Sequence, residues 1–214
     1  FTTTRTVLQS YNAVIDKAFM RELFLSVENG APDAVGDAVR RAKNNVIAVG
    51  SDVSVNKLQY ILLGDPALRL KIPQYKVVVD SFNGADVSAI SQLPAGGQLA
   101  VEGHVVRRDG SIADDFTGVL YSTLFDSAED VNTRNNTGLG SHQYTAFNKV
   151  LFSGSDSVVN GRFSFTAPVP MDISYSDEQG LLSFFAVDSS FLRSAQGRYE
   201  NFTVGGTAQD VVND

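Results

Sequence analysis

Apolar residues recur at helical spacing in the first third of the chain. One helical face is expected at Ile15, Ala18, Phe19 and Leu23, and a second at Val35, Ala38, Val39 and Ala42. A third helical stretch is expected over residues 58–62, and it must stop by Pro66 because proline has no amide hydrogen to continue a helix. Residues 2–7 favour a strand. One strand and about three helices are too few for an independent α/β domain, so we expect residues 1–73 to be the last slice of one.

From Tyr75 onward the apolar positions alternate with a period of two, and the segments become short. Strands are expected at residues 75–82, 99–106, 118–126, 181–187 and 199–206, and a hairpin at 155–169. Asn160-Gly161 is the expected two-residue turn of that hairpin, because this dipeptide favours the backbone that joins paired strands. About seven strands separated by turn signals fit an immunoglobulin-like β-sandwich.

Together these patterns predict an α+β chain. We place the boundary near Pro73, the β-sandwich over residues 74–206, and a tail over 207–214. Within the sandwich, the stretch from Asp126 to His142 is polar and rich in glycine and asparagine. This composition predicts a long exposed loop.

The composition excludes several functions. The formal net charge is −7 and Lys and Arg form no large cluster, which argues against a nucleic-acid partner. The sequence contains no cysteine, so it offers no thiol nucleophile, disulfide or zinc–thiolate site. No apolar run is long enough to span a bilayer.

The two histidines complete no catalytic triad. His104 lies in an alternating strand pattern, where a structural or surface role is the usual one, and His142 lies in the polar stretch. A Gly-x-Ser-x-Gly nucleophile motif is absent. We therefore assign no catalytic residue within this chain.

Three acidic residues in the polar stretch are candidate cation ligands. Asp126, Glu129 and Asp130 lie close together in the sequence, and carboxylate oxygens are the ligands that calcium prefers. The residue order of an EF-hand is missing, so a solvated acidic loop is the alternative interpretation. No other cofactor is expected.

Gly64-Asp65-Pro66 also admits two interpretations. A phosphate loop would need a following Lys-Ser/Thr, which the chain lacks. As a structural element, Gly64 relaxes the backbone, Asp65 accepts hydrogen bonds from neighbouring amides, and Pro66 forbids continuation of the helix. The sequence favours this structural role.

Several blocks resemble one family. Residues 2–7 (TTTRTV), 33–45 (DAVGDAVRRAKNN) and 56–75 (NKLQYILLGDPALRLKIPQY) resemble the closing segment of the gingipain-like cysteine peptidases. In that family a caspase-like domain ends in a Leu-Leu-Gly-Asp-Pro signature and an immunoglobulin-like domain follows. Residues 101–126, 158–175 and 180–190 are similar to the members that act as peptidase-sortases of the type IX secretion system.

The resemblance implies a non-catalytic C-terminal fragment of a longer enzyme. The family uses a cysteine thiolate activated by histidine, in a block that lies N-terminal to residue 2, so this chain is expected to be inactive alone. The positions that match belong to the scaffold beside the active site, and they are Arg5, Asn56, Gly64, Asp65 and Pro66. The parent would cleave C-terminal sorting signals from cargo at the outer-membrane surface, with protein substrates, secretion-system components or a surface glycan as partners.

A different class of function is the alternative. The β-sandwich alone would be a cell-surface binding or adhesion module for protein or glycan, with no enzymatic role. The polar stretch from Asp126 to His142 would then be the expected contact. A complete parent protein could both cleave and bind, so the two hypotheses exclude each other only for the isolated chain.

Overall fold

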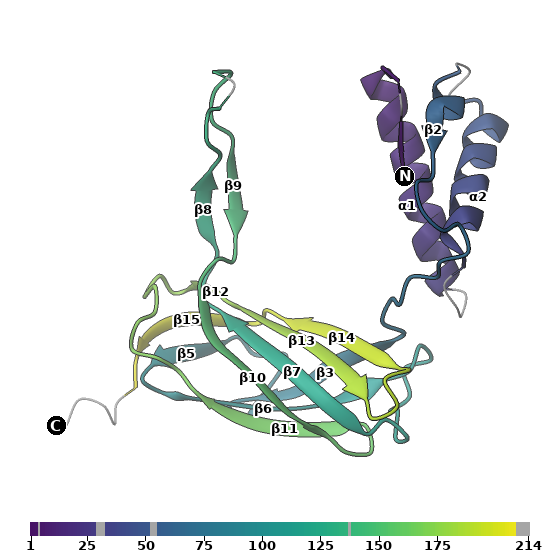
Figure 1. The fold of residues 1–214 in the computed structure, drawn as a ribbon. Helices are drawn as coiled ribbons and strands as arrows, with labels where there is room; N and C mark the ends of the chain where they lie inside the picture. Colours follow the sequence, from purple (N-terminus) through teal and green to yellow (C-terminus); the bar gives the residue numbers. More distant parts are fainter. Residues whose placement is uncertain (4, 29–32, 52–54, 137, 209–214) are drawn as a thin grey trace. The chain divides into compact units, whose positions relative to one another are not determined.

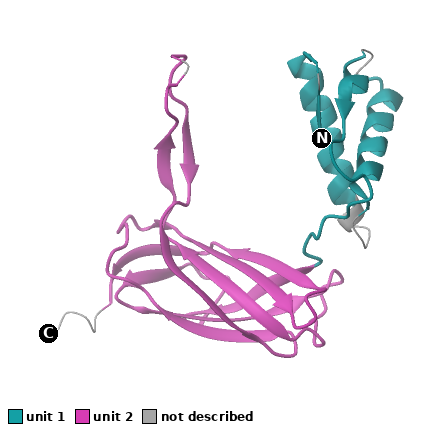
Figure 2. Cartoon of the chain, in the orientation of Figure 1, with its two compact units in different colours: residues 1–74 teal, residues 75–214 magenta. Residues whose placement is uncertain are grey.

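The computed structural model describes all residues except 4, 29–32, 52–54, 137 and 209–214. The chain divides into two compact units, residues 1–74 and 75–214 (Figure 2). Helices belong to the first unit and most strands to the second (Figure 1), which confirms the expected α+β class. The immunoglobulin-like type of the β-sandwich stays a prediction.

The first unit is built on two packed helices, α1 (Gln9–Glu28) and α2 (Val35–Ala48). The predicted faces meet there, because Ile15 of α1 packs with Ala42 and Val46 of α2. A further cluster joins Leu23 to the start of α2. A short antiparallel ladder, β1 (Thr2–Thr3) with β2 (Tyr60–Ile61), accompanies the helices.

The prediction of a third helix over residues 58–62 is wrong, and the strand expected at residues 2–7 is shorter than predicted. Residues Asn56–Gln59 form one 3₁₀ turn (η1), and the next two residues are the strand β2. Tyr60 and Ile61 pair with the two residues of β1. The Lys43 ammonium also donates to the Tyr60 carbonyl at 2.6 Å. Tertiary pairing therefore overrides the helical spacing of this segment.

The second unit is a β-sandwich of short strands (Figure 1). Its strands are β3 (Tyr75–Phe82), β4 (Ala85–Asp86), β5 (Ser91–Ala95), β6 (Gln98–Val106), β7 (Gly118–Phe125), β8 (Glu129–Asn132), β9 (Gln143–Ala146), β10 (Val150–Val158), β11 (Arg162–Pro168), β12 (Glu178–Gln179), β13 (Leu181–Asp188), β14 (Ser194–Tyr199) and β15 (Phe202–Thr207). The main sheet has the order β10-β7-β13-β14-β3-β6-β11, with β4 paired to β3. A smaller sheet has the order β12-β15-β5.

The core shows that the main sheet folds over on itself. Phe163 of β11 lies 5.8 Å from Phe184 of β13 between ring centroids, although these strands are far apart in the strand order. Phe82 of β3 stacks on Phe202 of β15 at 4.8 Å, which joins the smaller sheet to the same core. Both contacts lie in one buried cluster, as the two inner faces of a sandwich require.

The predicted hairpin at residues 155–169 is half right. Asn160 and Gly161 have positive φ angles of 52° and 74°, as the turn requires. The flanking strands do not pair beyond a single bridge, because β10 pairs with β7 and β11 pairs with β6. The Gly161 amide donates to the Phe116 carbonyl at 2.7 Å, so the turn is held by another loop while its strands diverge into the two layers.

Two other sequence predictions need correction. Residues 199–206 are not one strand, since β14 ends at Tyr199 and β15 begins at Phe202. The side-chain amide of Asn201, in the break, donates to the Val87 carbonyl at 2.7 Å. The polar stretch is not a plain loop either, because it contains β8 and β9, which pair antiparallel and extend away from the sandwich (Figure 1). We call residues 129–146 the β8–β9 ribbon.

Candidate functional site

The Gly-Asp-Pro segment caps a helix. The Pro66 carbonyl accepts a hydrogen bond from the Gly36 amide, and the Leu68 carbonyl accepts one from the Val35 amide, both at 2.9 Å. These donors are the first two of α2, and the residue that precedes them offers no side-chain cap. The Asp65 carboxylate accepts from the Ala67 amide at 2.8 Å, which shapes the turn. The Asp65 carboxylate thus stabilises the turn of the segment itself, and the Pro66 carbonyl binds the start of α2.

The other two scaffold positions make contacts in the segment that precedes α1. Asn56 is buried, and its side-chain oxygen accepts from the Leu8 amide at 3.0 Å, just before α1 begins. Arg5 is exposed, and its backbone is bonded to the Thr3 hydroxyl. Asn56 therefore fixes the start of α1, while the Gly-Asp-Pro segment fixes the start of α2.

The three acidic residues proposed as cation ligands have different surroundings. Asp126 is 1% exposed, whereas Glu129 and Asp130 are exposed on β8. Asp126 accepts hydrogen bonds from the Ser127 amide at 2.8 Å and from the Ser174 hydroxyl and amide at 2.7 and 2.8 Å. Among the described residues, no group of three or more histidines or acids is arranged to hold a metal ion. Calcium binding here stays a prediction.

Asp126 instead anchors the base of the β8–β9 ribbon. The Ser127 hydroxyl lies 2.6 Å from that of Ser174 and 2.7 Å from that of Ser176. Lys149, just beyond β9, places its ammonium 3.6 Å from the Asp126 carboxylate. These bonds tie both ends of the ribbon to one loop.

The two histidines lie in separate places. The His104 ring nitrogen Nδ1 lies 2.8 Å from the Asp80 carboxylate, which sits at a β-bulge of β3. His142 lies in the ribbon, where its amide donates to the Thr133 hydroxyl at 2.8 Å. The His104 ring thus meets a carboxylate, and His142 uses its backbone amide, so neither contact joins an imidazole to a nucleophilic hydroxyl or thiol.

A charge network that the sequence did not reveal surrounds Asp188. This carboxylate is 3% exposed and accepts from Arg193 Nε at 2.7 Å, while Arg193 Nη1 reaches Asp115 at 2.5 Å. Burial alone would raise the pKa of Asp188, but hydrogen bonds from Arg193, Ser190 and Leu192 hold that pKa well below its ordinary value. The network fixes the loop after β13, so we assign it a structural role.

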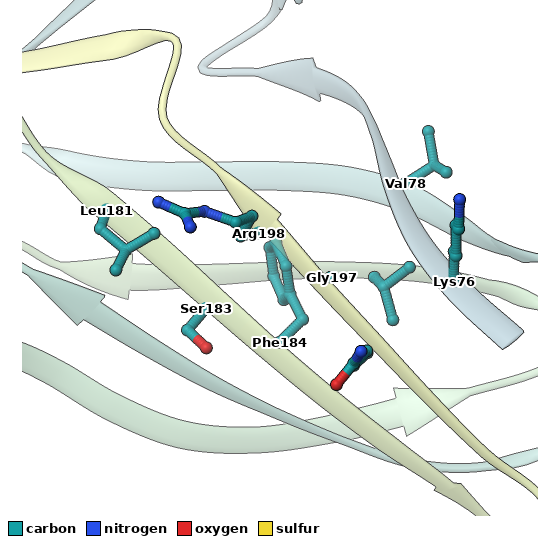
Figure 3. Close-up of a pocket in the computed structure, with 9 residues that line it drawn as sticks. Lys76, Val78, Leu181, Ser183, Phe184, Gly197 and Arg198 are labelled. Atoms are coloured by element: carbon teal, nitrogen blue, oxygen red, sulfur yellow. The ribbon is translucent and has the colours of Figure 1, made fainter. Parts of the chain in front are cut away.

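The second unit also carries an open groove on its main sheet. Strands β3, β13 and β14 enclose about 540 Å³, a volume within the range of ligand pockets. Its lining residues are Lys76, Val77, Val78, Leu181, Ser183, Phe184, Gln196, Gly197 and Arg198 (Figure 3). Apolar walls with a few polar groups are typical of a ligand-binding groove.

Comparison with known families supports the resemblance drawn from the sequence. Residues 1–71 match the family model described as peptidase family C25. Among solved structures, the chain is similar to dimeric latent PorU from Porphyromonas gingivalis, with 26% identity and a TM-score of 0.62. The match covers 86% of this chain and 18% of PorU, so the chain spans less than a fifth of that protein. The resemblance to gingipain-like peptidases is confirmed.

The remaining comparisons add little. A match to Spo0M, a sporulation control protein from Bacillus subtilis, has 14% identity and a TM-score of 0.39, and covers 63% of this chain and 51% of Spo0M. No curated protein matches the sequence. In the described part of the chain, no helix is long and apolar enough to cross a membrane.

Proposed function

We propose that this chain is the non-catalytic C-terminal part of a surface-located cysteine peptidase that resembles the type IX secretion sortase. The observation that carries the proposal is the match of residues 1–71 to peptidase family C25 in a sequence without cysteine. Residues 1–73 would be the end of the caspase-like domain, and residues 74–206 the following domain. The parent would cleave C-terminal sorting signals from secreted cargo.

The chemistry would lie outside this sequence. A thiolate attacks the scissile carbonyl, the amine leaves after protonation by histidine, and the resulting thioester is resolved by water or by an amine acceptor. The first unit would support that site through its backbone. The start of each helix is held in place, because the Asn56 side chain accepts from the Leu8 amide just before α1 and the Pro66 carbonyl accepts from the Gly36 amide, the second of α2.

The complete reading frame tests this proposal. We expect a cysteine and a histidine upstream of residue 1, at neighbouring strand ends of one sheet. Replacing that cysteine by alanine in the whole protein should abolish removal of the cargo sorting signal, measured as the mass of the secreted cargo. A reading frame without such a pair, or an alanine variant that still processes cargo, would contradict the assignment.

A second candidate function, binding of protein or glycan, is favoured by the β8–β9 ribbon. Val131 and Tyr144 are register partners on one face of the ribbon, and at its tip the Leu139 side chain is 90% exposed. No other described strand pairs with β8 or β9. A two-stranded ribbon on its own is only marginally stable in water, so the exposed side chains of Tyr144 and Leu139 on such a ribbon suit a contact with a partner.

Two substitutions in the ribbon test this second function. Leu139→Ser with Tyr144→Ser should reduce capture of purified cargo or surface glycan about tenfold, because each removes apolar contact area. The thermal midpoint should stay within about 2 °C, since both side chains are exposed. Capture is measured on immobilised chain, with Val150→Ser, an exposed apolar residue of β10, as the matched control. Capture that is equal in both variants would argue against the ribbon.

A further inference from the structure

The main sheet comes apart between β14 and β3. These strands run parallel and share only two residue pairs, Ala195 with Tyr75 and Gln196 with Lys76. On this edge β3 pairs next with β4, at Ser81 and Phe82. Among the described strands, none pairs with the facing edges of residues 197–199 of β14 and 77–80 of β3.

Two local features mark the point at which the strands part. At Gly197 a Cβ atom would lie 2.3 Å from the Val77 carbonyl oxygen, so only glycine allows the strands to meet at the point where pairing ends. Beyond it, β3 carries a bulge at Asp80, where its register against β6 shifts by one residue. A bulge bends a strand and increases its twist. The groove lies where the two strands part.

The polar groups of the groove are cationic or neutral. Lys76 and Arg198 line it together with Ser183 and Gln196, and no acidic residue is among its lining residues. Within the described chain, no carboxylate lies within ion-pair distance of Lys76, whereas Arg198 pairs with Glu200. Such an exposed pair is worth little, so Arg198 can exchange Glu200 for another carboxylate. In a chain of net charge −7, this is a locally positive site.

We propose that this groove binds an extended peptide segment of another protein by strand addition. The segment would hydrogen-bond the unpaired edge of β14 and place an acidic side chain against Lys76 and Arg198. Its apolar side chains would lie on the partly exposed Val78 and Leu181. The backbone of a peptide can pair with the free N–H and C=O groups of a strand edge, whereas a saccharide has no such repeating backbone. We therefore propose a peptide and not a saccharide as the ligand. The proposal is independent of the peptidase assignment.

The test begins with a phage-displayed library of linear heptapeptides, selected on the chain of residues 1–214. Enriched sequences should contain an acidic residue flanked by apolar or β-branched residues. The most enriched heptapeptide, acetylated, amidated and labelled with fluorescein on an added lysine, is then titrated by fluorescence anisotropy. Its free carboxylate is blocked, so only a side-chain acid can supply the charge.

Three comparisons decide the outcome. Lys76→Glu should weaken binding at least tenfold, whereas Arg134→Glu, the same charge change in the ribbon, should leave it unchanged. Replacing the acid of the peptide by its amide should weaken binding similarly, and backbone N-methylation of the segment should abolish it. Circular dichroism confirms that Lys76→Glu is folded, as expected for an exposed residue. Equal effects of the two variants, tolerance of N-methylation, or enrichment of no acidic peptide would overturn the proposal. So would binding of heparin oligosaccharide in place of the peptide.

Discussion

Replacing Asp188 by alanine is expected to lower the free energy of unfolding of the second unit by about 3 kcal/mol, because it removes the buried partner of a charged hydrogen-bonded network. The variant leaves Arg193 without its Nε contact, and it frees the amides of Leu192 and Arg193, which Asp188 now accepts at 3.1 Å each. Urea denaturation followed by tyrosine fluorescence measures the loss. Asp114→Ala is the matched control, since its side chain is 80% exposed, and it should change the stability little.

The same carboxylate predicts an acid limb of stability. The pKa of Asp188 is lower in the folded than in the unfolded chain, so its contribution is present above the unfolded pKa of about 4 and is lost as the pH falls below that value. Asp188→Asn should therefore flatten the fall in stability below about pH 4. An unchanged acid limb in that variant would show that other carboxylates control it.

Gly36→Val is expected to destabilise the first unit by about 2–3 kcal/mol through overpacking against the backbone. A Cβ at this position would lie 2.7 Å from the Pro66 Cβ and 2.9 Å from its carbonyl oxygen, so the capping segment must move away from α2. Hydrogen exchange measured by mass spectrometry should show faster exchange in the first turn of α2. Asp65→Ala should cause a smaller loss of about 1 kcal/mol, because it removes one local hydrogen bond.

Asn44→Val is the control for placing a β-branched residue in α2, because Asn44 is exposed. If it destabilised the unit as much as Gly36→Val, contact with Pro66 would not be the cause. If neither Gly36→Val nor Asp65→Ala changed the unfolding of the first unit, the structural role of the Gly-Asp-Pro segment would be refuted.

The sequence correctly predicted features that depend only on residues close together in the chain. The turn at Asn160-Gly161 is present because the positive φ angles that it needs are a property of those residues. The predicted apolar faces of α1 and α2 pack together for the same reason, since helical spacing alone determines which side is apolar. The family resemblance rested on blocks of this local kind.

The sequence did not predict which distant residues pair with one another. The partners of β10 and β11 depend on the two layers of the sandwich, so a correct turn gave a wrong hairpin. Tyr60 and Ile61 pair with residues almost sixty positions earlier, and the spacing of nearby apolar residues gives no information about such a distant partner. In the same way Arg193 reaches Asp115 across 78 positions, and the groove exists only because β14 meets β3.

The parallel pairings in the second unit also set the order in which it can fold. Strand β3 is the first of the unit and pairs with β14, and β5 pairs with β15, the last strand. During synthesis on the ribosome, β3 and β5 must therefore wait for more than a hundred residues before these partners emerge. Until then their edges are open to other chains, so a nascent or truncated sandwich is the form of this protein most in need of a chaperone.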